Sequence, residues 1–192
     1  MARLFDDAGP QYLNAGSAVV TAPPFSLSAW GYCDDDADPG PDCAVSVTDA
    51  GTVDHYHRLD MRMDVAGNPI RAVSVDGATP GEAETSSGAT VNTWHHLCGV
   101  WAATNDRRVY IDGGSKGTDA STQNVNNATD LYIGAFYNGA ILGVTFSGRV
   151  AEVAAWSATL TDAEVASLAA GDRKSTRLNS SHKSVSRMPS SA

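Results

Sequence analysis

The side chains in this sequence that could do chemistry are mainly carboxylates. Before position 172 there are four glutamates, Glu82, Glu84, Glu152 and Glu164. A glycoside hydrolase needs two carboxyl groups facing each other, roughly 5–10 Å apart. Glu82 and Glu84 would share one face of an extended chain, but Gly81 and residues 86–88 predict a loop there. The sequence also lacks a nucleophile elbow, a zinc-ligand spacing, a phosphate loop and a dinucleotide fingerprint, so we expect no enzymatic activity.

Acidic residues gather in one short segment where a cation could bind. Positions 34 to 42 contain five aspartates, Asp34, Asp35, Asp36, Asp38 and Asp42. Calcium takes six to eight oxygen ligands, often from carboxylates and carbonyls on loops. Asp34 and Asp36 are therefore candidate calcium ligands. The alternative, which we favour, is a solvated loop whose like charges repel one another.

Histidine and cysteine give weaker indications. His95 and His96 are adjacent in an apolar run, and neighbouring side chains of a strand point to opposite faces, so they cannot chelate one metal together. Cys33 and Cys43 flank the acidic segment and could be bridged if the segment closes a hairpin, or could stay reduced in a cytosolic setting. Cys98 is expected to be a small buried residue.

The elements that position these residues are predicted to be strands. Apolar and polar residues alternate with period two in many short runs separated by Gly, Pro, Asn and Asp turns. These runs are 2–5, 11–13, 25–32, 43–47, 56–63, 70–75, 93–101, 108–111, 131–134 and 148–156. A capping box at Thr161 and Glu164 predicts one helix, which Gly171 ends. We therefore predict an all-β, two-sheet antiparallel sandwich with one short C-terminal helix.

Four tryptophans lie in the predicted strands. They are Trp30, Trp94, Trp101 and Trp156. Large rings commonly fill the space between packed sheets. We predict that these four rings form the filling of the sandwich.

Five motifs, in order, resemble a known family. They are the sequences FSLSAW at 25–30, TWHHL at 93–97, RVYIDG at 108–113, LYIG at 131–134, and FSGRVAEV at 146–153 followed by LTDAE at 160–164. They resemble laminin-G-like jelly-roll domains of the concanavalin-A-like lectin/glucanase superfamily, most closely its phage and bacterial structural-protein branch. The resemblance implies one jelly-roll domain over residues 1–171.

The resemblance also implies a possible calcium site. Related jelly rolls often hold one ion between an aspartate near the N-terminus and an aspartate in the last strand. Asp6 matches the first position, and Glu152 is the candidate partner. The second position departs from the family, because Ala151 precedes Glu152 where an aspartate is usual. Calcium is therefore possible, and no other cofactor is expected.

The sequence leads us to expect that the protein recognises a ligand or serves as a structural component. We expect a non-catalytic module of a phage particle or bacterial surface, with two alternatives: a carbohydrate-binding lectin-like module, or an inactive or divergent glycoside hydrolase relative. Ligands of jelly rolls usually meet loops at one rim or one concave face, here the acidic segment and the loops at 124–127 and 137–139. The candidate ligand residues are Asn126, Asn127, Tyr137 and Asn138, whose side chains suit sugar hydroxyls or a protein partner and equally suit turns.

The net charge of the chain and its terminal segments limit which partners it could bind and where it could be located. The chain carries a formal charge of −9 and has no apolar run long enough for a membrane helix and no signal peptide. Such an acidic chain disfavours nucleic acid, and a virion-associated or extracellular place requires delivery by a larger assembly. Residues 172–192 hold five of the 13 basic residues and seven serines, and positions 172–182 match one reading frame of a common sequencing-library adaptor. We expect a disordered tail that is a translated adaptor.

Overall fold

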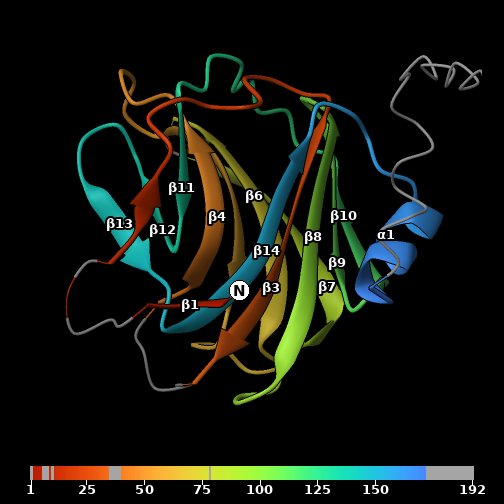
Figure 1. Ribbon diagram of the computed structural model, residues 1–192. Coiled ribbons are helices and arrows are strands. Elements are labelled where there is room, and N and C mark those ends of the chain that lie inside the picture. Colours follow the sequence, from red (N-terminus) through yellow and green to blue (C-terminus); the bar gives the residue numbers. More distant parts are fainter. Residues whose placement is uncertain (1, 6–8, 10, 35–39, 78, 172–192) are drawn as a thin grey trace, which may run out of the picture.

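The computed structural model describes residues 2–5, 9, 11–34, 40–77 and 79–171. Two six-stranded antiparallel sheets lie face to face (Figure 1). The first sheet has the order β1 (Ala2–Phe5), β14 (Gly148–Trp156), β3 (Phe25–Cys33), β8 (Trp94–Ala103), β9 (Asp106–Ile111), β10 (Gly114–Asp119). The second has the order β2 (Leu13–Asn14), β11 (Asp130–Ile133), β4 (Asp42–Thr48), β5 (His55–Met61), β6 (Pro69–Asp76), β7 (Pro80–Gly88). The predicted sandwich is confirmed.

The main core lies between the two sheets. Phe25, Leu27 and Ala29 of β3 are fully buried there, because alternate residues of a strand point to the same face. Leu59 and Met61 of β5 belong to the same apolar cluster. Burial of these side chains is the main force that holds the sheets together.

The prediction for the tryptophans is right for one ring of four. Trp101 is fully buried between the sheets and stacks on Phe25 at 4.8 Å between ring centroids. Trp30 alternates with Ala29 and therefore lies on the outer face of the first sheet, where Trp94 and Trp156 also remain partly accessible. Position within the strand, rather than ring size, decides which face each ring occupies.

The helix α1 (Asp162–Ala169) covers part of that outer face (Figure 1). Its predicted capping box is confirmed, with Thr161 and Glu164 bonded reciprocally. Val165 packs with Leu160 onto Cys98, Val100 and Tyr110 of the first sheet. The helix therefore covers the part of the outer face formed by Cys98, Val100 and Tyr110.

Strand β7 was predicted as a loop, and this prediction was wrong. Gly81, Ala83 and Thr85 are buried while Glu84 is exposed, which is the alternation of a strand built from small residues. Gly117 of β10 lies against the backbone of Glu84, where a side chain would clash with its carbonyl oxygen. Small residues allow the edges β7 and β10 of the two sheets to meet.

The outer face of the second sheet is partly covered by a hairpin. Strands β12 (Ala135–Tyr137) and β13 (Leu142–Thr145) pair with each other, and Ser46 of β4 donates to the carbonyl of Ala135 at 3.0 Å. Phe136 of this hairpin packs on Tyr56 at 4.8 Å. This hairpin was not predicted as a separate element.

The three cysteines are buried, and none of them forms a disulfide. Cys33 belongs to the core between the sheets and Cys43 to the cluster around Phe136 on the outer face of the second sheet. Because they belong to different clusters, the possible bridge between them does not form. Residues 172–192 lie outside the described residues, and no helix within the described part is long and apolar enough to span a membrane.

Candidate functional site

The outer face of the first sheet carries neighbouring aromatic side chains from two strands, beside the part that the helix covers. The register pairs Tyr32 of β3 with Trp94 of β8, and Trp30 with His96. On the other side of β3, Arg149 of β14 pairs with Tyr32. We call these five residues, Trp30, Tyr32, Trp94, His96 and Arg149, the aromatic face. Its members come together only because three strands distant in sequence are neighbours in the sheet.

The rings of the aromatic face contact one another. Tyr32 and Trp94 lie 5.5 Å apart between centroids with their planes tilted by 53°, and Trp30 meets the edge of His96 at 5.5 Å. Trp94 is 37% exposed although it is a large apolar side chain. Burial lowers the pKa of His96, so its imidazole is neutral at physiological pH. The face is thus an apolar, accessible platform.

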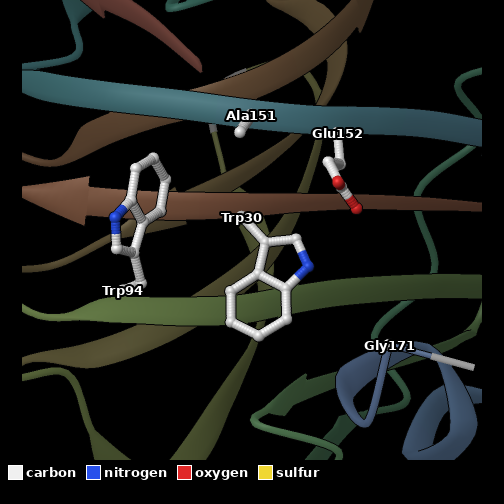
Figure 2. A pocket seen from close by; sticks show the side chains of 5 residues that line it. All are labelled: Trp30, Trp94, Ala151, Glu152 and Gly171. Carbon is white, nitrogen blue, oxygen red and sulfur yellow. The ribbon is translucent and has the colours of Figure 1, made fainter. Parts of the chain in front are cut away.

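A pocket of about 370 Å³ opens on this platform. It is lined by Trp30, Trp94, Ala151, Glu152 and Gly171. Figure 2 shows Trp94, Trp30 and Glu152 in succession across the view, with Ala151 on the strand next to Trp30. Ala151 is the direct partner of Trp30 in the register, and its small side chain leaves the indole uncovered. The size is in the lower part of the range of small-molecule pockets.

Glu152 reaches this pocket through an irregularity of β14. The register with β3 shifts between Ala151 and Ala154, and Glu152 has a φ of 50°. A bulge adds one residue to a strand and re-aims its side chain. A non-glycine residue in the left-handed region costs roughly 1–3 kcal/mol, and such strain is concentrated at functional sites. The bulge places a carboxylate on the face that regular alternation would have denied it.

The arrangement suits a ligand that has both apolar and polar sides. The indoles offer flat apolar surfaces, while Glu152 can accept hydrogen bonds and Arg149 can donate them. The guanidinium carbon of Arg149 lies 4.8 Å from the centroid of the Tyr32 ring. The hydroxyl of Tyr32 donates to Oδ1 of Asn92 at 3.2 Å, which holds the ring in place.

The four predicted ligand residues lie elsewhere, near the turn between β4 and β5. The backbone N–H of Asp54 donates to the carbonyl of Asn138, and that of Ala50 donates to Thr129, which follows the loop holding Asn126 and Asn127. Tyr137 packs on Tyr132 at 6.1 Å between centroids. Their ligand role stays a prediction.

Asn138 has a clear structural role in the hairpin. Its side-chain oxygen accepts from the backbone of Ala140 and Ile141 at 3.0 and 2.9 Å, as in an Asx turn. Asn126 and Asn127 are exposed. Residues 35–39 of the acidic segment lie outside the described residues, so a ligand site shared by this segment and these loops stays a prediction.

The candidate metal ligands do not converge in the described residues. Asp6 and Asp36 lie outside them. Asp34 accepts from the hydroxyl of Ser147 at 3.4 Å, whereas Glu152 lines the pocket beside Trp30. Among the residues that the structure describes, no group of three or more His, Cys, Asp or Glu could hold a metal ion. Ala151 has no side-chain oxygen at the position where the family usually has an aspartate.

Glu82, another carboxylate considered for catalysis, is engaged in a structural contact. Glu82 accepts from Nη1 of Arg71 at 2.9 Å on the outer face of the second sheet. The same Arg71 donates from Nε and Nη2 to the buried Asp60 at 3.0 and 3.1 Å. Nε of Arg58 lies 2.9 Å from Asp60 as well. These four residues form a buried ion network.

The two adjacent histidines behave as expected and lie on opposite faces. His95 contacts Asp112 of the following hairpin, with 2.7 Å between Nδ1 and Oδ2, and accepts the backbone N–H of Thr90 at Nε2. Asp112 also accepts the backbone N–H of His96 at 2.9 Å. The Trp-His-His and Asp-Gly motifs are therefore linked structurally.

The residues of the aromatic face were missed as a site, although a signal existed. Trp30 and Tyr32 share the parity of Ser26 and Ser28, opposite to the core residues Phe25 and Leu27. Large aromatics on the polar parity of a strand indicate an exposed platform. Arg149 could not be assigned because its neighbours depend on the strand order.

Comparisons with known proteins agree with this fold. A laminin-G-type family model, described as the concanavalin A-like lectin/glucanases superfamily, matches residues 7–166. No curated protein matches by sequence. Among solved structures, a heptameric pentraxin of Limulus polyphemus has a TM-score of 0.69 and 13% identity, covering 88% of this chain and 80% of its own.

Two further similar structures were solved with sugars. Domain 4 of the arabinanase AbnA from Geobacillus stearothermophilus, in complex with arabinotriose, has a TM-score of 0.68 and 16% identity over 88% of this chain and 76% of its own. The carbohydrate-binding module of family 40 from the Ruminococcus gnavus IT-sialidase, bound to α2,3-sialyllactose, has a TM-score of 0.62 and 11% identity over 76% and 82%. At these identities the likeness concerns the fold.

Proposed function

The chain belongs to the concanavalin A-like lectin/glucanases superfamily, and from this premise we propose that it is a non-catalytic carbohydrate-binding module. The observation that carries the proposal is the open pocket floored by Trp30 and Trp94. A sugar ring has an apolar C–H side and polar edges. It can lie on an indole while its hydroxyls bond to side chains at the rim.

Two of the similar structures support a sugar as the ligand class. They hold arabinotriose and α2,3-sialyllactose on the same sandwich architecture. The fold supports many functions, so the argument depends on the aromatic face itself. A protein partner would gain less from a pocket of this size, since stable protein interfaces bury roughly 800 Å² per partner.

The absence of catalysis is part of the proposal. Glu152 is the one carboxylate among the five residues that line the pocket, whereas glycoside hydrolysis generally needs two. Glu82 is bonded to Arg71, and Glu164 caps the helix. A divergent glycoside hydrolase is therefore the weaker alternative. Hydrolysis of a glucan by this protein, lost when one glutamate is replaced, would support it.

A role at the surface of a phage particle or bacterium extends the proposal. It is supported by the resemblance of the five motifs to the phage and bacterial branch of the family. In that setting the module would attach a larger assembly to a glycan-bearing surface. The neighbouring genes test this extension, and phage tail genes beside this one are the expected finding.

Binding to immobilised glycans, followed by calorimetry on the best ligand, tests the main proposal. We expect Trp30→Ala and Trp94→Ala each to weaken binding about tenfold or more, equivalent to about 1.4 kcal/mol. Tyr12→Ala removes a ring of similar exposure, 41%, from outside the pocket and serves as the matched control. Equal losses in all three variants, or binding unaffected by both Trp changes, would overturn the proposal.

Replacing Glu152 by glycine should separate binding from stability. Glycine tolerates the φ of 50° at this bulge, so the melting temperature should stay within a few degrees of wild type or rise. Loss of the carboxylate should weaken glycan binding several-fold. The control is Val153→Gly, which removes a partly buried side chain packed on the core and should lower the melting temperature. Unchanged affinity in Glu152→Gly would exclude this carboxylate from the site.

A further inference from the structure

We propose that the aromatic face selects glycans that carry a carboxylate, such as uronic or sialic acid residues, and that Arg149 binds this carboxylate. The inference rests on the proposed function and names the ligand class of the same site. It follows from the pairing state of the basic side chains, the position of Arg149 and the distribution of charge around the pocket.

Most basic side chains of the described residues are already neutralised. Six of the eight form ion pairs with Asp or Glu within 4.0 Å: Arg58, Arg62, Arg71, Arg107, Arg108 and Lys116. Arg149 has no ion pair with another described residue, and its recorded contact is with the ring of Tyr32. Arg3, the other of the eight, also has no ion pair with a described residue and lies over the ring of Phe5. Of these two arginines, Arg149 is the one that belongs to the aromatic face. In the described part of the chain its guanidinium therefore meets an aromatic ring rather than a carboxylate.

The stacked position of Arg149 prepares its guanidinium for a planar anion. Stacking on an aromatic ring uses the flat face of the group and leaves its N–H edge available. That edge can donate two parallel hydrogen bonds to one carboxylate. The Tyr32 ring is itself held by Asn92 and packs against Trp94, so the platform under the guanidinium is fixed. Less conformational freedom is therefore lost when the anion binds.

The charges around the pocket favour one orientation of the bound ligand. Arg149 and Ala151 alternate on the same face of β14, so Arg149 lies one step along the strand from the pocket-lining Ala151. It is beside Tyr32, which lies between it and Trp94. Glu152 lies beyond Trp30, on the side away from Trp94 (Figure 2). A sugar carboxylate would point to the Arg149 end, and hydroxyl groups would point to Glu152. The opposite orientation would bring two carboxylates together.

The test uses pairs of glycans that differ only in the acidic group. Lactose is compared with α2,3-sialyllactose, and a methyl-esterified oligogalacturonide with the free acid, by calorimetry at low and high salt. Wild type should bind at least one acidic member about tenfold tighter than its neutral partner, and salt should reduce the difference. Arg149→Gln should abolish the preference, and Arg149→Lys should lose most of it because an ammonium group cannot form the two-pronged contact.

Failure of this inference can be told apart from failure of the proposed function. If neutral and acidic members bind equally and Trp30→Ala weakens both, the function stands and the selectivity is wrong. If a preference exists but Arg149→Gln retains it, Arg149 is not the selecting residue and the inference is overturned. If no glycan binds at all, the proposed function fails with it. The melting temperature of Arg149→Gln should match wild type within a few degrees, because the side chain lies on the outer face of the first sheet and forms no ion pair with another described residue.

Discussion

Replacement of Asp60 by alanine is expected to lower the free energy of unfolding by about 3–5 kcal/mol, the usual loss when a buried ion pair is broken on one side. Asp60 is fully buried, and Arg71, which donates two hydrogen bonds to it, is 3% exposed. The variant leaves the charge of Arg71 with Glu82 as its remaining partner, and Arg58 loses its nearby carboxylate. A buried charge without sufficient compensation is expensive because water no longer solvates it.

The control for this prediction is a similar ion pair at the surface. Arg62 and Asp64 are joined by two hydrogen bonds of 2.6 and 2.9 Å, and both side chains keep about a fifth of their surface exposed. Asp64→Ala should therefore cost about 1 kcal/mol or less. Urea unfolding of both variants, followed by circular dichroism, measures the difference. Equal losses in the two variants would mean that burial does not set the strength of the Asp60 network.

The sandwich could be predicted because its strongest strands repeat a simple pattern. Residues 25–32 alternate so regularly that both faces of β3 are evident from the sequence. The helix could be predicted from its capping box alone. Both signals are local, since each depends on residues within about ten positions of one another. The order of the strands in each sheet, by contrast, was not predicted, because it depends on pairing between segments that are distant in the sequence.

Strand β7 was not predicted as a strand, because its stability comes from contacts with neighbouring strands. Its inward-facing residues, Gly81, Ala83 and Thr85, are small or polar and have little strand propensity of their own. They are buried because β6 pairs with the strand on one side and β10 meets its backbone. Such contacts cannot be read from the segment itself, which looks like a loop. Glu82 and Glu84 were therefore assigned to a loop, although they lie on a strand.

The site was misjudged for the opposite reason, because residue type was given more weight than position. Trp30 and Trp94 were assigned to the core since large rings are usually buried. Their parity in the strands already excluded that, and the buried ring of the set is Trp101. Glu152 is harder, since a bulge is needed to bring it to the outer face. The acidic and asparagine-rich loops attracted attention, although Asn138 acts as a turn residue.

Because the ring of His57 is buried, we expect the protein to lose stability in mild acid. Its ring is fully buried in the core, 5.0 Å from Phe25 and 5.6 Å from Trp101 between centroids. Burial, aided by the charge of Arg107, lowers the pKa of His57 to about 3. The unfolded chain, in which this pKa is near 6.5, therefore binds one more proton than the folded chain at intermediate pH.

The hydrogen bonds around His57 explain why protonation of its ring is unfavourable in the folded state. The hydroxyl oxygen of Ser74 accepts from Nε1 of Trp101 at 2.9 Å and from Nε of Arg107 at 3.2 Å. A hydroxyl has one hydrogen to donate, and here it is directed to Nδ1 of His57 at 2.8 Å. Protonation of Nδ1 would place two donors against each other and a positive charge in the core.

The expected result is a free energy of unfolding that falls by about 1.4 kcal/mol for each pH unit below 6.5, or roughly 4–5 kcal/mol by pH 3. Above pH 6.5 this loss of stability is absent, because both the folded and the unfolded state carry a neutral imidazole. The interval from pH 6.5 to 5 is the most informative, since it precedes most carboxylate titration. Urea unfolding at half-unit steps measures the slope, to which the lowered pKa of His96 adds in the same direction.

Two further measurements assign the slope to His57. His57→Gln keeps a hydrogen-bonding side chain but cannot titrate, so its stability should be lower at pH 7 and less dependent on pH between 6.5 and 5. If that variant does not fold, the imidazole resonances of the native protein give the same information: those of His57 should stay at their neutral positions down to pH 5. A native His57 that titrates near pH 6.5 would show that its ring is open to water, which contradicts the packing of Phe25, Trp101 and Ser74 around it.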